Sequence, residues 1–203
     1  MAKQRPSQVF LAVVMLALYY MMAYHLERHE TFLLLVVFTG LFVIYLGALW
    51  NLSQLNIQFI IGCSILFRLI FLFAEPQLSD DYFRFLWDGH LWSNGINPFA
   101  QVPAYYMQSS QQMPPGLTPE LFNLVNSPTH YTVYPPIPQF INVISVSLSP
   151  GSYLGAAIVM RLFLIAAEVG TMYFALNILQ LTKMDSKKIA FYSLNPLIII
   201  ELT

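Results

Sequence analysis

The sequence predicts an all-α fold, a polytopic bundle of transmembrane helices. Hydrophobic residues make up 57% of the chain and aromatic residues 15%, whereas charged residues contribute only 9%. That balance is typical of a membrane protein rather than a soluble domain. Only helices and closed barrels satisfy the backbone in lipid, and the long unbroken apolar runs differ from the alternating segments of a barrel. We therefore expect helices embedded in the membrane.

Charge and motif content exclude several functions. The chain has 9 Lys and Arg against 10 Asp and Glu, so no basic surplus is available for nucleic acid. The single cysteine, Cys63, cannot form an intrachain disulfide or a Cys-based zinc site. The histidines lack the spacing of a metal-binding helix, and no phosphate-binding glycine loop or G-x-S-x-G turn occurs. Any activated substrate is therefore expected to be a lipid itself.

Residues 1–74 are predicted to form three transmembrane helices, over Val9–Tyr24, Thr31–Trp50 and Gln58–Ala74. Each approaches or exceeds the ~17 residues that a spanning helix needs. The first run resembles a signal peptide, but no small-x-small cleavage site follows it, so we expect a retained anchor. Lys3 and Arg5 place the N-terminus in the cytoplasm. Three crossings then bring the next loop to the extracytoplasmic side.

Residues 75–135 are predicted to form this extracytoplasmic loop. Its centre, Gln101–Pro119, has the prolines and polar residues of irregular coil. The segment Asp80–Trp92 contains no proline, and Ser79 is a suitable N-cap for a helix there. Spacings of three and four residues put Asp81, Arg84 and Asp88 on one face. With its aromatic residues, this helix is expected to be amphipathic and to lie along the membrane interface.

Residues 136–203 are predicted to supply further membrane helices and to complete a single membrane domain over 1–203. Tyr153–Leu181 is a clear span, whereas Ile137–Leu148 and Ile189–Thr203 are short. Lys183, Lys187 and Lys188 face the cytoplasm only if Ile137–Leu148 dips into the membrane without crossing; otherwise they face outward. The chain ends within an apolar segment, which indicates a fragment of a longer protein.

Asp80 and Asp81 are the candidate catalytic residues, because a carboxylate at the membrane face can take a proton from an attacking hydroxyl. Helix capping is the alternative. Arg84 could bind a lipid phosphate or pair with Asp88 within the helix.

Arginines within the apolar runs have two interpretations. Arg161, in a span with Glu168, could reach a donor phosphate or extend to the interface, and the two lie roughly 10 Å apart, too far to pair. Arg68 is expected to extend to the interface. Tyr134, before Pro135, is expected to serve structure more than chemistry.

Motifs in order along the chain resemble a known family. Asp81-Tyr82, Asn97-Pro98-Phe99, Tyr131 through Pro136 and Asn195-Pro196-Leu197 resemble the catalytic subunit of glycosylphosphatidylinositol mannosyltransferase I. The stretch from Arg84 through Trp87-Asp88-Gly89 to Gly95-Ile96-Asn97-Pro98 is closer to its bacterial relatives, the polyprenol-phosphate-dependent hexosyltransferases of the GT-C type. The resemblance extends from Leu78 to Leu202.

The resemblance implies a GT-C membrane fold, a polyprenyl-phosphate sugar donor and an extracytoplasmic acidic motif that activates the acceptor. The Asp-x-Asp motif of the eukaryotic relatives falls on Ser79 and Asp81 in this sequence. Asp81 is therefore the first candidate for the base, with Asp80 as its partner. In these relatives, further spans and a segment containing His and Asp follow the Asn-Pro-Leu motif.

We therefore expect an integral-membrane glycosyltransferase of a bacterial cytoplasmic membrane. It is expected to move a hexose, with mannose as the candidate, from the polyprenyl-phosphate donor to a lipid or glycan acceptor. The predicted substrate-binding residues are Arg84, Asp88, Arg161 and Tyr134. No cofactor is expected beyond the lipid-linked donor, and no metal site is predicted, although the need for a divalent cation is left open. The alternatives are a transporter or lipid flippase that uses Arg161 and Glu168, and an inactive membrane remnant.

Overall fold

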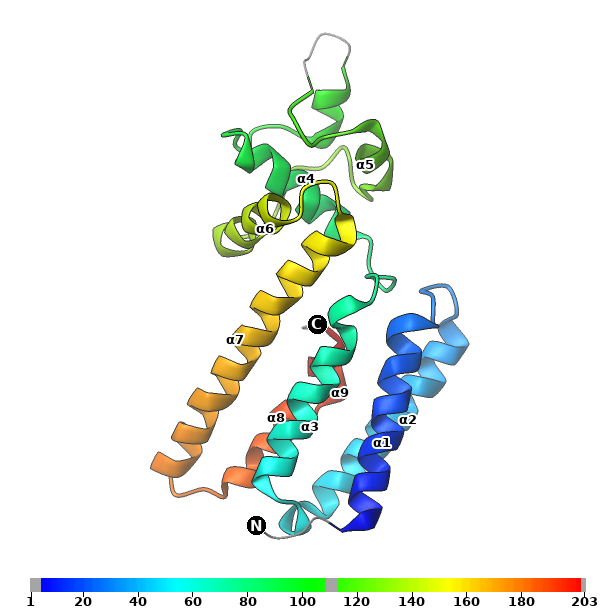
Figure 1. The fold of residues 1–203 in the computed structure, drawn as a ribbon, viewed down its shortest axis with the longest axis vertical. Helices are drawn as coiled ribbons and strands as arrows, with labels where there is room; N and C mark the ends of the chain where they lie inside the picture. The colour runs from blue at the N-terminus through cyan, green and yellow to red at the C-terminus, as the bar shows by residue number, and fades with distance from the viewer. Residues whose placement is uncertain (1–4, 109–112, 202–203) are drawn as a thin grey trace. The chain divides into compact units, whose positions relative to one another are not determined.

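The computed structural model of the chain describes residues 5–108 and 113–201, and every regular element in these two ranges is helical (Figure 1). The chain divides into two compact units. One, called here the bundle unit, contains the chain up to Ala74 together with the segment from Leu164 onward. The other, the loop unit, is Glu75–Phe163. The all-α class predicted from the sequence is confirmed.

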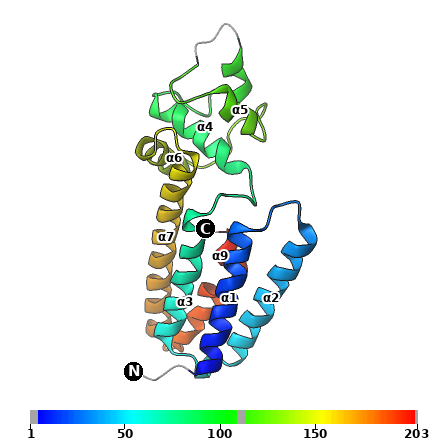
Figure 2. The same cartoon turned by 45° about the vertical axis from the view of Figure 1, so that its right-hand side comes forward.

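The bundle unit is built on three N-terminal helices, α1 (Pro6–Tyr24), α2 (Thr31–Trp50) and α3 (Ile57–Ile70). A short turn, η1 (Leu52–Gln54), joins α2 to α3, and η2 (Phe71–Phe73) continues α3. The helix α1 packs against both α2 and α3 (Figure 2). The last part of α7 (Tyr153–Leu181) also belongs to this unit.

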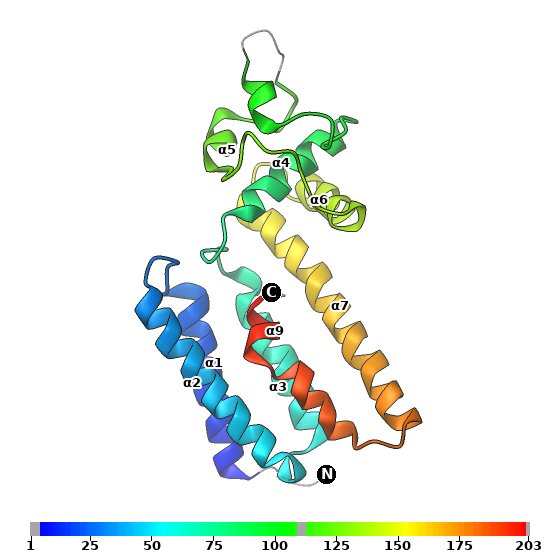
Figure 3. The ribbon, with the colours of Figure 1, turned by 180° about the vertical axis from the view of Figure 1, so that it is seen from behind.

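Three short C-terminal helices complete the bundle unit: η4 (Ser186–Ile189), α8 (Ala190–Ser193) and α9 (Pro196–Glu201). Both α8 and α9 lie along α3, on the side seen in Figure 3. Among the described residues, α1, α2 and α7 are long and apolar enough to cross a membrane, whereas Ile57–Phe73 is a shorter apolar helix. The boundaries of α2 and α7 match the predicted segments residue for residue.

Two basic residues, Arg5 and Lys187, bind to the α2–α3 connection at one end of the bundle unit. Arg5 donates from Nη1 to Gln54 Oε1 at 2.5 Å, and Lys187 donates from Nζ to the Ser53 carbonyl at 2.6 Å. The start of α1, the α2–α3 connection and the segment after α7 therefore share this end. Arg5 and Lys187 therefore lie at the same end of the bundle unit.

The predicted extension of Arg68 to the interface is wrong. Its side chain is fully buried, and Nη2 pairs with Glu168 Oε2 of α7 at 2.8 Å. Its Nη1 donates to Ser64 Oγ on α3 and to the Ser193 carbonyl, and Tyr192 donates its hydroxyl to Glu168 Oε1 at 2.7 Å. A charge buried in an apolar bundle needs a partner, and here that partner comes from a helix distant in sequence.

The loop unit contains α4 (Asp81–Ser93), η3 (Pro103–Met107), α5 (Pro119–Leu124), α6 (Pro136–Leu148) and the first part of α7. The N-cap of α4 is Asp80, one residue later than predicted. Ser79 Oγ instead accepts the N–H of Asp81 at 3.2 Å. The region predicted as coil contains η3, and residues 109–112 of that prediction lie outside the described residues.

Protein rather than lipid covers the apolar face of α4. Leu86, Trp87 and Leu91 are buried in one cluster with residues of the loop, α5 and α6. At Gly89 the backbones of α4 and α6 approach closely, since a Cβ there would lie 2.8 Å from the Asn142 carbonyl oxygen. This packing gives α4 a fixed position against α6.

Candidate active site

Asp81, the first candidate for the catalytic base, lies at the start of α4 and is half-buried. Asn126 Nδ2 donates a hydrogen bond of 2.6 Å to Asp81 Oδ1. No side chain in the described ranges hydrogen-bonds to Oδ2. One carboxylate oxygen is therefore held in place while the other can accept a proton, which is the arrangement that a general base needs.

Arg84 and Asp88 form a buried ion pair one turn further along α4. Arg84 Nε donates to Asp88 Oδ1 at 3.0 Å, and the two side chains are 3% and 0% exposed. Arg84 Nη1 also donates to the carbonyls of Ser127 at 3.3 Å and His130 at 3.0 Å. Of the two interpretations predicted for Arg84, the structure shows the ion pair. Because the pair is buried, breaking it should cost far more free energy than breaking an exposed ion pair on a protein surface.

A second helix satisfies the other oxygen of Asp88. Gln139 of α6 donates from Nε2 to Asp88 Oδ2 at 2.8 Å and to Thr132 Oγ1 at 3.1 Å. Gln139 is fully buried and Thr132 nearly so. The Asp88 carboxylate therefore connects α4, α6 and the segment that precedes α6.

This buried network supports Asp81 indirectly. Arg84 donates a hydrogen bond to the carbonyl of Ser127, and the neighbouring residue Asn126 donates one to Asp81. Ser127 Oγ also donates to Asn126 Oδ1 at 3.0 Å, which orients the amide. The position of the Asp81 carboxylate is thus coupled, through one loop segment, to the ion pair in the interior.

Tyr134 lies next to this cluster. Its ring meets Phe85 edge-on, with the ring centroids 4.6 Å apart. Burial raises the pKa of Tyr134, the Asp81 carboxylate raises it further, and Arg84 acts in the opposite direction. The hydroxyl therefore stays protonated at neutral pH and can donate a hydrogen bond.

The charges of Asp80 and Arg161 both affect a second tyrosine, Tyr82. Burial raises the pKa of Tyr82 to about 12, with further raising contributions from Glu75, Tyr153 and Asp80 and a lowering contribution from Arg161. Arg161 is 7% exposed on α7, whereas Asp80 is exposed at the N-cap of α4. The Tyr82 hydroxyl therefore stays protonated at neutral pH, and the charges of a carboxylate and a guanidinium both act on it.

The predicted site residues thus fall into two neighbouring groups within the loop unit. Asp81, Tyr134 and the Arg84–Asp88 pair form one, and Asp80 and Arg161 form the other around Tyr82. Among the described residues, no group of three or more His, Cys, Asp or Glu side chains is placed to hold a metal ion.

Sequence reasoning missed several of these residues. On α6, Gln139, Asn142 and Ser145 recur every three residues and are all buried. That spacing in an otherwise apolar segment could have indicated a polar face directed at α4. Asn126 gave no such signal, because its contact with Asp81 depends on how the loop returns to α4.

Comparison with known proteins identifies the family of the chain. Residues 7–203 match a protein family described as alpha-(1->6)-mannopyranosyltransferase, N-terminal domain. No curated protein and no solved structure matches the chain. The family and the three helices of membrane-spanning length together indicate a glycosyltransferase of the membrane. Because the match covers nearly the whole sequence, the chain belongs to the alpha-(1->6)-mannopyranosyltransferase family, in the N-terminal domain of that family.

Proposed function

We propose that the protein transfers a mannose residue from a polyprenyl-phosphate donor to a hydroxyl of a lipid or glycan acceptor at the extracytoplasmic face of the membrane. Membership of a mannosyltransferase family supports the sugar and the reaction class. The observation that carries the proposed mechanism is the half-buried Asp81 carboxylate, held at Oδ1 by Asn126 with Oδ2 left to accept a proton.

In the proposed reaction the acceptor hydroxyl oxygen attacks the anomeric carbon of the donor sugar with inversion. Its proton passes to Asp81 Oδ2 as the new C–O bond forms. The bond between the anomeric carbon and the phosphate oxygen breaks, and polyprenyl phosphate leaves with the electron pair. Arg161 and the protonated Tyr82 hydroxyl stabilise the charge that grows on that phosphate, since such donors act most strongly where charge develops.

The other predicted site residues take supporting roles. Asp80 orients the acceptor beside Asp81, and the Tyr134 hydroxyl donates to an oxygen of the sugar or acceptor. The sequence predicted that Arg84 and Asp88 bind substrate. Their near-complete burial favours a positioning role instead, exerted through Ser127 and Asn126.

The proposed sidedness follows from the basic end of the bundle unit. Arg5 and Lys187 lie at that end, and the positive-inside tendency assigns it to the cytoplasm. The helix α3 starts next to this end, so the chain leaves its far end at Phe73 and enters the loop unit. Asp80 and Asp81 then face the extracytoplasmic side.

The transporter alternative assigned function to Arg161 and Glu168. The structure gives Glu168 two internal partners, Arg68 and Tyr192, and the family is one of transferases. No observation therefore favours transport, and no second function is proposed.

The test is Asp81→Asn in the full-length protein, assayed in membranes for transfer from a polyprenyl-phosphate mannose. Loss of a general base lowers the rate by about 10²- to 10⁴-fold. Glu120→Gln is the matched control, because Glu120 is an exposed carboxylate at the start of α5 in the same unit. Undiminished transfer by Asp81→Asn would remove Asp81 from the mechanism.

A further inference from the structure

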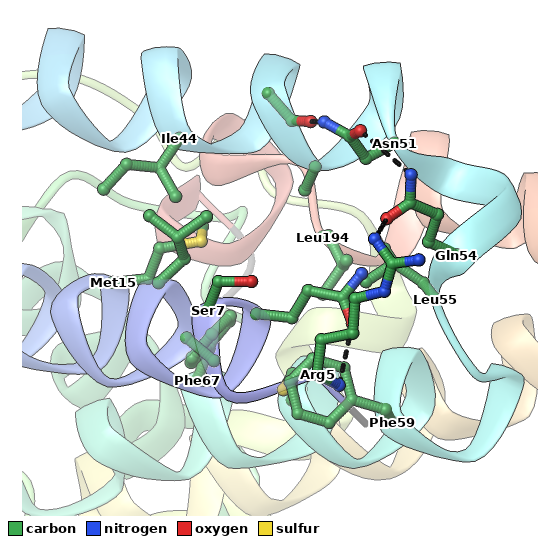
Figure 4. Close-up of a pocket in the computed structure, with 16 residues that line it drawn as sticks. Arg5, Ser7, Met15, Ile44, Asn51, Gln54, Leu55, Phe59, Phe67 and Leu194 are labelled. Carbon is green, nitrogen blue, oxygen red and sulfur yellow. Dashed lines mark hydrogen bonds between the residues drawn. The ribbon is translucent and has the colours of Figure 1, made fainter. Parts of the chain in front are cut away.

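The bundle unit contains a pocket that the proposed transfer reaction does not use. It lies between α1, α2 and α3 and has a cavity volume of about 330 Å³, within the range of small-molecule sites (Figure 4). It lies at the basic end of this unit, where Arg5, Asn51 and Gln54 form part of its wall.

Three polar residues of the pocket lie together at one end. Figure 4 shows Arg5, Asn51 and Gln54 together there, joined by hydrogen bonds from Arg5 Nη1 to Gln54 and from Gln54 Nε2 to Asn51 Oδ1. Within the described ranges only Nη1 of the exposed Arg5 guanidinium has a partner, and no lining residue carries a carboxylate. As far as residues 5–108 and 113–201 show, no carboxylate neutralises the positive charge at this end, and the guanidinium has further N–H donors for a ligand.

Apart from Ser7, Gln8 and Cys63, the rest of the pocket is apolar. Met15, Ile44 and Phe67 line it at the end away from Arg5, and Leu11 and Phe59 add further apolar wall. Two of the three helices that form it, α1 and α2, have the length and hydropathy of membrane spans. A cation at the mouth of an apolar cavity, at the end of membrane helices, matches a molecule with an anionic head and a hydrocarbon tail.

We propose that this pocket binds a phospholipid with a net negative headgroup, such as phosphatidylglycerol. One acyl chain enters the apolar part between Met15, Ile44 and Phe67, and the headgroup phosphate receives hydrogen bonds from Arg5. The Asn51 and Gln54 amides lie beside that phosphate. The lipid would tie the start of α1 to the α2–α3 connection, so the site is structural or regulatory and does not depend on the transferase mechanism.

The chain offers two variants that separate the headgroup from the tail. Arg5→Gln removes the charge from an exposed side chain, and Lys188→Gln is its control, because Lys188 is an exposed cation after α7 that does not line the pocket. Gly47→Leu fills the cavity from its α2 wall, where a Cβ would meet nothing within 4 Å. Gly62→Leu is the control, since Gly62 has equal space on α3 but does not line the pocket.

The experiment titrates purified, delipidated protein in detergent with phosphatidylglycerol or phosphatidylcholine and counts bound lipid by native mass spectrometry. Wild type is expected to prefer phosphatidylglycerol. Arg5→Gln should lose about tenfold in affinity for it, the equivalent of one charge-assisted hydrogen bond, with little change for phosphatidylcholine. Gly47→Leu should weaken binding of both lipids, and the two controls should bind as wild type does.

A second readout uses Cys63, which lines the pocket and is the single cysteine of the chain. Bound phosphatidylglycerol should slow its labelling by a maleimide in wild type but not in Arg5→Gln at the same lipid concentration. Equal binding of the two lipids, or labelling that the lipid does not slow, would overturn the proposal. If Gly47→Leu does not fold, the exposed Arg5→Gln variant still decides, because unchanged binding there is sufficient to reject the site.

Discussion

The bundle unit and the loop unit each contain a buried arginine–carboxylate pair, and these two pairs are built differently. In the bundle unit Arg68 of α3 pairs with Glu168 of α7, 100 residues away. In the loop unit Arg84 pairs with Asp88 four residues along the same helix. The first pair joins two helices, whereas the second stays within α4 and reaches outward to loop carbonyls and to Gln139.

The different surroundings of the two pairs suggest different roles, one in the stability of the fold and the other in the geometry of the candidate site. The other hydrogen-bond partners of the Arg68–Glu168 pair are Tyr192, Ser64 and Ser193, which all lie within the bundle unit. The Arg84–Asp88 pair is continuous with the segment that holds Asn126 against Asp81. Breaking the first pair is therefore expected to cost mainly stability, and breaking the second to cost activity as well.

The largest effect is expected from Glu168→Leu. It leaves the buried Arg68 guanidinium without its carboxylate, which costs about 3 to 5 kcal/mol of unfolding free energy. The double variant Arg68→Met/Glu168→Leu removes both charges and should recover most of that loss. Thermal unfolding in detergent measures both. Equal destabilisation by the single and double variants would show that the two side chains are not coupled.

Asp88→Asn tests the positioning role of the second pair. The amide keeps the shape but weakens the hold on Arg84, so the Ser127 segment and Asn126 shift relative to Asp81. A displacement of ~1 Å at a reacting group can cost about a hundredfold in rate. We expect kcat to fall with little change in KM, and the effect of Asp81→Asn to be smaller in this background. Additive losses would separate Asp88 from Asp81.

Gly89→Ala tests the contact that fixes α4 against α6. The new Cβ would lie 2.8 Å from the Asn142 carbonyl oxygen and 3.2 Å from Val146 Cγ1, and a backbone atom cannot easily move away. We expect destabilisation by about 1 to 3 kcal/mol. Gly170→Ala on α7 is the control: a Cβ there meets nothing within 4 Å, so helix propensity should leave stability unchanged or raise it. Chemical denaturation of both variants measures the difference, and equal stability would mean that the two helices separate easily.

The smallest effect is expected from Tyr192→Phe. It removes the donor to Glu168 Oε1 but leaves the ion pair with Arg68 intact. Loss of one hydrogen bond to a charged group costs about 1.5 to 3 kcal/mol when buried, and less here because the tyrosine is only partly buried. Transfer activity should be unchanged, since Tyr192 lies in the bundle unit. A loss of activity at constant thermal stability would contradict the separation between the two units.

The fold class and the helix boundaries could be predicted from the sequence more accurately than the contacts of the candidate site. Runs of apolar residues gave α2 and α7 without error, and proline-free charge spacing gave α4 within one residue. Local spacing also predicted the Arg84–Asp88 pair as one of two alternatives. It failed for Arg68, because an apolar helix does not reveal which other helix supplies a counter-charge.

The sequence by itself determined which segments are helical and which charged residues share a helix face. These properties depend on hydrophobic runs and i, i+4 spacings, which are local in the chain. The tertiary structure alone decided which distant groups meet: Glu168 with Arg68, Asn126 with Asp81, and Gln139 with Asp88. It also brought Arg5 and Lys187 to one end of the bundle unit. Such contacts depend on the packing of helices and the paths of loops. A buried charge without a partner is costly, and its partner can come from any part of the chain that packs beside it.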